Sequence, residues 1–151
     1  MASPAQSAAL FAWTFPREPP SVALARAFVS DVLPHVPCVR CNEELRQTVV
    51  LLVSEVTTNA VRHGAGSHFL VECQVPDPTR LTVTVHDDGP GLPCPRVATA
   101  EDEGGRGLAL LDLLADEWRY EHRGPGKAVA FTVTAPTLRS RKCAVRVTAL
   151  P

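Results

Sequence analysis

Residues 42–64 read NEELRQTVVLLVSEVTTNAVRHG, and this segment sets the architecture of the chain. Apolar side chains recur in it at helical spacing, which predicts one continuous apolar face. The residues of that face are Leu45, Val49, Leu52, Val53, Val56 and Ala60. Asn42 is a favourable N-cap and Gly64 a natural stop. We therefore predict a helix of several turns, capped at both ends and packed against a core.

Two polar residues, Glu55 and Asn59, lie at the edge of this apolar face. They are four positions apart, so they share one side of the helix. An amide oxygen can bind a hard cation, and a carboxylate can accept a proton. The pair therefore suits a metal-bound anionic ligand beside the core. An ordinary polar flank on an amphipathic helix explains the same two residues.

Composition narrows the class of protein. The chain has 151 residues with 45% hydrophobic residues, which suits one globular domain. Its net charge of -1 provides no basic field for nucleic acid or an anionic membrane. No apolar run approaches the roughly 20 residues of a membrane span. The first residues lack the pattern of a secretory signal, so we expect a cytoplasmic protein without membrane contact.

The five cysteines are scattered along the chain, which does not indicate a disulfide framework. His35, Cys38 and Cys41 have a spacing that could ligate a metal ion. A structural zinc site needs four ligands, however, and no second pair follows. We therefore expect free thiols.

The remaining periodicity predicts alternating strands and helices around the central helix. We expect strands at 11–15, 68–75, 81–87, 118–122 and 127–134. We expect a helix capped by Ser21 and a second helix that begins at Leu108. Residues 1–9 are interpreted as a disordered lead, 10–136 as the domain and 137–151 as a basic tail. That tail lacks interleaved aromatic residues, so it does not indicate a nucleic-acid site.

Two glycine-rich segments point to a ligand. The strand at 81–87 ends in Asp87 and continues as Asp88-Gly89-Pro90-Gly91, which places a carboxylate where backbone can approach a ligand closely. Later, Gly104, Gly105 and Gly107 surround Arg106 just before the helix at Leu108. Exposed N–H groups at a helix start bind phosphate well, although a plain flexible connection also fits. The non-periodic segment 92–103 between them is predicted to be a loop that closes over a ligand.

The three segments together resemble the GHKL ATPase family, which includes gyrase, heat-shock chaperone and histidine kinase ATPases. SEVTTNAVRHG looks like the N box of that family, VHDDGPG like its first glycine box and GGRGLAL like its second. The likeness runs from about Phe11 to Ala135. It is strongest to the bacterial anti-sigma factor serine/threonine kinases. We therefore expect the Bergerat-type ATP-binding fold, a two-layer α/β sandwich whose mixed, mostly antiparallel sheet carries helices on one face.

The resemblance implies roles for particular residues. Asn59 would ligate Mg²⁺ that bridges the ATP phosphates, and Asp87 would accept a hydrogen bond from the adenine amino group. Gly89 and Gly91 would let backbone approach the base and ribose. Glu55 would act as base toward the attacking hydroxyl group.

The resemblance also implies phosphate contacts by four residues of the second glycine box: Gly105, Arg106, Gly107 and Leu108. Arg62 and His63 are further candidates for contact with the nucleotide. The chain departs from the family pattern in three residues. Val56 stands where Leu is usual, Gly64 stands where Ala is common, and Asp88 adds a second carboxylate that we interpret as a solvated turn residue.

The partners implied by the resemblance are a sigma factor and a STAS-type antagonist protein whose serine or threonine receives the phosphoryl group. Regulation of transcription by partner switching would follow, and a homodimer is compatible with the family. Three alternatives stay open: a nucleotide-dependent binding module that transfers no phosphate, an isolated ATPase domain of a histidine-kinase-like protein, and a small ATPase without a regulatory partner.

Overall fold

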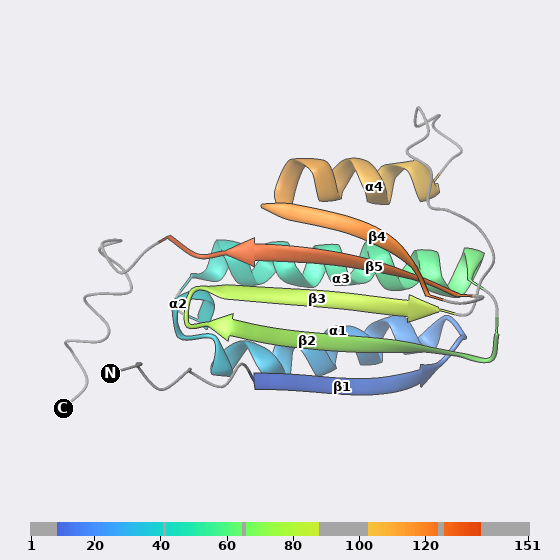
Figure 1. Ribbon diagram of the computed structural model, residues 1–151, viewed down its shortest axis with the longest axis horizontal. Coiled ribbons are helices and arrows are strands. Elements are labelled where there is room, and N and C mark those ends of the chain that lie inside the picture. Colours follow the sequence, from blue (N-terminus) through green and yellow to red (C-terminus); the bar gives the residue numbers. More distant parts are fainter. Residues whose placement is uncertain (1–8, 41, 65, 88–102, 124–125, 137–151) are drawn as a thin grey trace.

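The computed structural model describes residues 9–136 apart from 41, 65, 88–102 and 124–125, and it places helices over one face of a five-stranded sheet (Figure 1). The strand order is β1-β2-β3-β5-β4, and every neighbouring pair is antiparallel. The strands are β1 (Ala9–Pro16), β2 (His68–Asp77), β3 (Arg80–Asp87), β4 (Glu117–Arg123) and β5 (Gly126–Thr134). The predicted two-layer α/β sandwich is confirmed.

The sheet has one buried and one polar face because its side chains alternate. In β3, Leu81, Val83 and Val85 are buried, whereas Thr82 and Thr84 on the other face are half-buried. β2 alternates in the same way. Its Cys73 is a free thiol in the core, and burial raises the pKa of this thiol to about 12, so it stays protonated at neutral pH.

Helix α3 (Glu43–His63) is the central helix predicted from the sequence. The Asn42 side chain accepts a hydrogen bond from the Leu45 N–H at 3.1 Å, and the Gly64 N–H donates to the Ala60 carbonyl at 3.0 Å. Both predicted ends of this helix are therefore confirmed. Its buried residues face the sheet and the other helices: Val49, Leu52, Val53, Val56, Thr57 and Ala60.

Helix α1 (Pro20–Val32) packs beside α3 and under β1. The expected cap by Ser21 is wrong. Pro20 occupies the first helical position, where its fixed φ suits the helix, and Pro19 becomes the cap residue. Ser21 is therefore inside the first turn and is buried. A short 3₁₀ helix η1 (Leu33–His35) and α2 (Pro37–Arg40) lead on to α3.

Helix α4 (Glu103–Leu114) begins five residues before the predicted start at Leu108. Gly104, Gly105 and Gly107 therefore lie within the helix and not before it. Glycine has poor intrinsic helix propensity, which explains the late predicted start. The buried side chains of Leu108 and Leu111 anchor the helix on the core and outweigh that propensity.

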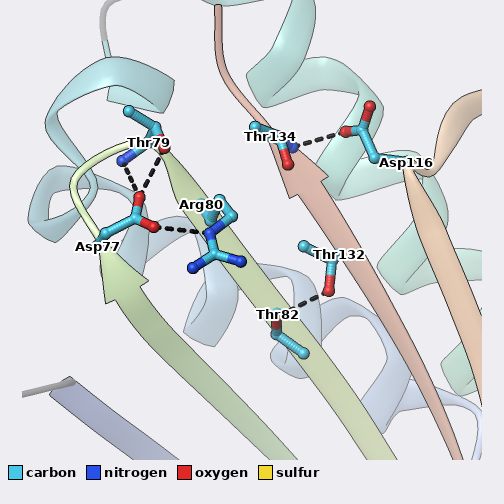
Figure 2. A network of polar contacts seen from close by, with 7 residues as sticks. All are labelled: Asp77, Thr79, Arg80, Thr82, Asp116, Thr132 and Thr134. Atoms are coloured by element: carbon cyan, nitrogen blue, oxygen red, sulfur yellow. Dashed lines mark hydrogen bonds and ion pairs between the residues drawn. The ribbon is translucent and has the colours of Figure 1, made fainter. Parts of the chain in front are cut away.

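Polar contacts fix the end of the sheet at which β3 begins (Figure 2). Asp77 accepts hydrogen bonds from the Thr79 N–H at 2.8 Å, the Thr79 hydroxyl at 2.6 Å and the Arg80 Nε at 2.6 Å. The Thr79 hydroxyl and then the backbone and Arg80 contacts lower the pKa of Asp77. Nearby, Asp116, which directly precedes β4, accepts a hydrogen bond from the Thr134 N–H at the end of β5 at 2.6 Å.

Several expectations fall on residues that the structure does not describe: the lead 1–8, most of the loop at 92–103, the tail 137–151, and Cys41, Cys94 and Cys143. None of the helices in the described part of the chain has both the length and the apolar character needed to cross a bilayer.

Candidate functional site

A cavity of about 30 Å³ lies where the end of β3 meets the C-terminal half of α3, the first turns of α4 and the start of β5. These four ends gather at one side of the molecule (Figure 1). The cavity has a largely apolar lining with three polar side chains, Asn59, Asp87 and Lys127. The apolar lining residues are Val56, Ala60, Val85, Leu108, Leu111 and Val129. The structure thus brings together Asn59 and Asp87, two residues that lie in separate sequence boxes.

Asp87 occupies the inward-facing position at the end of β3, and only 6% of its surface is exposed. Its register partner in β5 is Lys127, which is also buried. Residues directly opposite on antiparallel strands have Cβ atoms about 4.5–5.5 Å apart. An acidic and a basic residue therefore start from neighbouring backbone positions at the cavity.

Gly64 packs directly against Asp87. A Cβ atom at position 64 would lie 2.3 Å from the Ala60 carbonyl oxygen and 3.1 Å from the Asp87 Cγ. The first distance is a severe overlap with backbone, so a side chain at this position requires the end of α3 to move. The glycine that departs from the family pattern is therefore favoured by the tight turn at the end of α3, with Asp87 of β3 as a second close neighbour.

Glu55 and Asn59 are both half-buried on α3, one turn apart. Asn59 lines the cavity, whereas Glu55 lies outside its lining. Arg62 and His63 are exposed in the last turn of the same helix, where basic residues complement the helix dipole. Glu55, the predicted base, therefore lies one helical turn from Asn59 on the same side of α3, outside the cavity lining.

The second glycine box enters the site through α4. Leu108 is buried at 5% exposure and lines the cavity. Gly105, Arg106 and Gly107 lie in the helical backbone that precedes it. Asp88, Gly89 and Gly91 fall outside the described residues.

Arg17 is a positioning residue that the sequence reasoning missed. Its Nε donates to the Gly66 carbonyl and its Nη1 to the Val61 carbonyl, both at 2.7 Å. Its own N–H donates to the Ser67 carbonyl at 2.8 Å. The side chain thereby ties the end of β1 to the last turn of α3. No residue type marks a backbone carbonyl as an acceptor, so the sequence carried no signal for this contact.

Lys127 was also missed as a site residue. It shares one face of β5 with Val129, Phe131 and Val133, three apolar residues that face the helices. A charged residue at an inward position of an otherwise apolar strand face is unusual, because lysine is almost never fully buried. That break in the pattern was visible in the sequence.

Comparison with known proteins agrees with this architecture. The family model of the histidine kinase-like ATPase domain matches residues 15–133, so the chain belongs to the histidine kinase-like ATPase family. An uncharacterized protein of Streptomyces coelicolor is 39% identical over 80 residues, which are 51% of this chain and 76% of that protein. ATP binding is the property that this family implies, and the family predicted from the sequence is confirmed.

The crystal structure of the RsbU and RsbW domains of a Mycobacterium tuberculosis protein shares the fold. The TM-score is 0.58 at 20% sequence identity, and the match covers 84% of this chain. The match covers 32% of the mycobacterial chain, so this protein corresponds to about a third of that structure.

The side chains at the cavity suit a Mg²⁺ ion whose ligands are mostly oxygens of phosphate and water. Among the described residues, no group of three or more His, Cys, Asp or Glu side chains could hold a metal ion. Asn59 offers one amide oxygen at the cavity. Mg²⁺ typically binds with few protein ligands beside substrate phosphates, and Asn59 fits that role.

Proposed function

We propose that this chain is an ATP-dependent serine/threonine protein kinase of the anti-sigma factor type. The observation that carries the proposal is the cavity that joins Asn59 of the N box, Asp87 of the first glycine box and Leu108 of the second. These residues are far apart in the sequence, and all three line the same cavity. Membership of the histidine kinase-like ATPase family makes ATP the ligand to expect there.

In this proposal Asp87 accepts a hydrogen bond from the exocyclic amino group of adenine. Its burial at the end of β3 places an acceptor where water has little access, and such a bond gains strength in a low-dielectric site. Asn59 would hold Mg²⁺, whose charge neutralises the phosphates. The backbone around Gly105, Arg106, Gly107 and Leu108 would contact the phosphates, with Arg62 and His63 nearby on α3.

The proposed reaction is phosphoryl transfer to a serine or threonine of an antagonist protein. The hydroxyl oxygen of the acceptor attacks the γ-phosphorus, and its proton passes to Glu55. The bond from the γ-phosphorus to the β–γ bridging oxygen breaks, and ADP leaves with that electron pair. The chain contributes position and charge more than covalent chemistry, as is general for phosphoryl transfer.

The proposed partners are a sigma factor and a STAS-type antagonist, and two copies of the chain would act together as a homodimer. This assignment is supported by the wording LLVSEVTTNAVRHG at 51–64 and by the common fold with the mycobacterial RsbU and RsbW domain structure. It places the protein in the bacterial cytoplasm, where sigma factors act.

Replacing Glu55 by Gln tests the reaction. The change keeps the shape of the side chain and removes its basicity, so we expect loss of phosphate transfer to a panel of STAS-domain proteins and unchanged ATP affinity. Glu44→Gln is the matched control, because Glu44 is exposed in the first turn of the same helix. Transfer that survives in Glu55→Gln would exclude Glu55 as the base. Binding of ATP without transfer by the wild type would favour a nucleotide-dependent binding module.

Isothermal titration tests the metal role of Asn59. Asn59→Ala should weaken ATP binding in the presence of Mg²⁺ and have little effect in its absence. An equal loss under both conditions would contradict a ligand role, because a direct contact to the nucleotide does not depend on the metal ion.

A further inference from the structure

Lys127 is a buried lysine for which the proposed chemistry has no role so far. Only 9% of its surface is exposed, at an inward-facing position of β5. Lysine is almost never this deeply covered in folded proteins unless it is paired. A lysine at this inward position therefore indicates a ligand with a polar group that it can meet.

The position of Lys127 relative to Asp87 indicates which part of a ligand it meets. The two residues are directly opposite in register, and both line the cavity with Asn59. Together they offer a hydrogen-bond acceptor and a hydrogen-bond donor side by side. Adenine carries the complementary pair along one edge, since its amino group donates and the neighbouring ring nitrogen N1 accepts.

We propose that Lys127 is a nucleobase-recognition residue whose ammonium group donates a hydrogen bond to N1 of adenine. The inference rests on the proposed ATP site, in which Asp87 accepts from the amino group. Guanine presents a donor at N1 and an acceptor at the exocyclic position, which reverses the order. The pair of Asp87 and Lys127 therefore selects adenine over guanine by the placement of its donor and its acceptor.

No other described residue that lines the cavity carries a positive charge. The neighbouring inward residue, Val129, contributes only apolar surface to the same lining. Lys127 is thus the one cation available at this cavity among the described residues, and a conservative change at this position removes it.

The experiment compares two ligands on two proteins by isothermal titration. The ligands are ATP and 1-deazaadenosine triphosphate, in which a C–H group replaces N1. We expect the wild type to bind ATP about 10-fold to 100-fold more tightly than the analogue, as for a hydrogen bond to a charged group. Lys127→Met keeps the apolar part of the side chain and removes the ammonium group. We expect this variant to lose the preference for ATP and to bind both ligands with equal affinity.

Arg119→Met is the matched control, because Arg119 lies on the neighbouring strand β4, outside the cavity lining, and pairs with Glu121 at 2.9 Å. It should keep both wild-type affinities. A Lys127→Met protein that still prefers ATP over the analogue by the wild-type factor overturns the inference, even if all its affinities fall. So does a Lys127→Met protein with wild-type affinity for ATP.

If Lys127→Met does not fold, the wild type alone still tests the inference. Equal binding of ATP and the 1-deaza analogue by the wild type then overturns the role of Lys127. A wild type that binds neither ligand contradicts the ATP site itself. Failure of the further inference is thereby distinguished from failure of the proposed function.

Discussion

The two ends of strand β3 are marked by carboxylates in contrasting surroundings, one from the last residue of β2 and one from the last residue of β3. At the start, Asp77 is half-exposed, and its three hydrogen bonds come from Thr79 and Arg80 within the same turn (Figure 2). At the other end, Asp87 is buried beside α3, α4 and β5. The first carboxylate closes a local turn, whereas the second belongs to a site built from distant segments. The structural acid and the proposed ligand-binding acid thus lie on neighbouring strands, so each can be changed without the other.

Asp87→Asn should produce the largest effect. It replaces a buried acceptor by a group that can donate toward the amino group of adenine, a loss of about 1–3 kcal/mol in the free energy of ATP binding. Isothermal titration measures it directly. Asp77→Asn is the control at the other end of β3 and should leave the affinity unchanged. Unchanged affinity in Asp87→Asn would contradict the assigned site.

Gly64→Ala tests how tightly the chain turns at the end of α3, beside Asp87. We expect it to lower the free energy of unfolding by about 2 kcal/mol, because the new Cβ overlaps the Ala60 carbonyl. Urea denaturation provides the measurement. Ser67→Ala is a control in the same connection, where Ser67 is exposed and should tolerate the change. A fully stable Gly64→Ala protein would show that the end of α3 shifts easily.

Arg17→Ala removes the contacts that hold the last turn of α3. The hydrogen bonds involve a charged donor but are partly exposed to solvent, so we expect a loss of about 1 kcal/mol in the free energy of unfolding. Amide hydrogen exchange should accelerate near Val61 and Gly64 while the middle of α3 stays protected. Arg46→Ala, at the exposed opposite end of the helix, should leave both unchanged. Uniform acceleration along α3 would argue against a local clamp.

Asp77→Asn should produce the smallest effect, a loss of about 0.5 kcal/mol at neutral pH, because the turn is partly exposed. The pKa of Asp77 is lowered in the folded protein. Its stabilising contribution is therefore complete above the ordinary carboxyl pKa and disappears as the pH falls through the lowered value. Urea denaturation from pH 7 to pH 2 should show a weaker acid dependence in Asp77→Asn than in the wild type. An identical acid dependence in the two proteins would show that Asp77 does not contribute to the change of stability with pH.

Local signals predicted the parts of the fold that depend on neighbouring residues. Asn42 and Gly64 lie at the two ends of α3 as expected, because a cap acts within one turn. The alternation in β3 was clear because each residue reports its own face. Prediction failed at Ser21, since a proline at the first helical position takes precedence over the cap preference of serine.

Only part of the candidate site could be predicted from the sequence. Asn59 and Asp87 were found because each belongs to a recognisable box, although their meeting in one cavity depends on packing. Lys127 lies opposite Asp87 only because β5 is placed between β3 and β4, and strand order is a property of the whole sheet. The partners of Arg17 are backbone carbonyls, which leave no mark in the sequence.

The Arg17 clamp has a consequence for the order of folding. Its two side-chain bonds join residues that are 44 and 49 positions apart, so they close long segments of chain. Closure of such loops costs entropy that must be offset by other contacts, here the pairing of β1 with β2 that brings Pro16 opposite His68. We therefore expect a refolding chain to gain helix and sheet first and to become competent for nucleotide binding last.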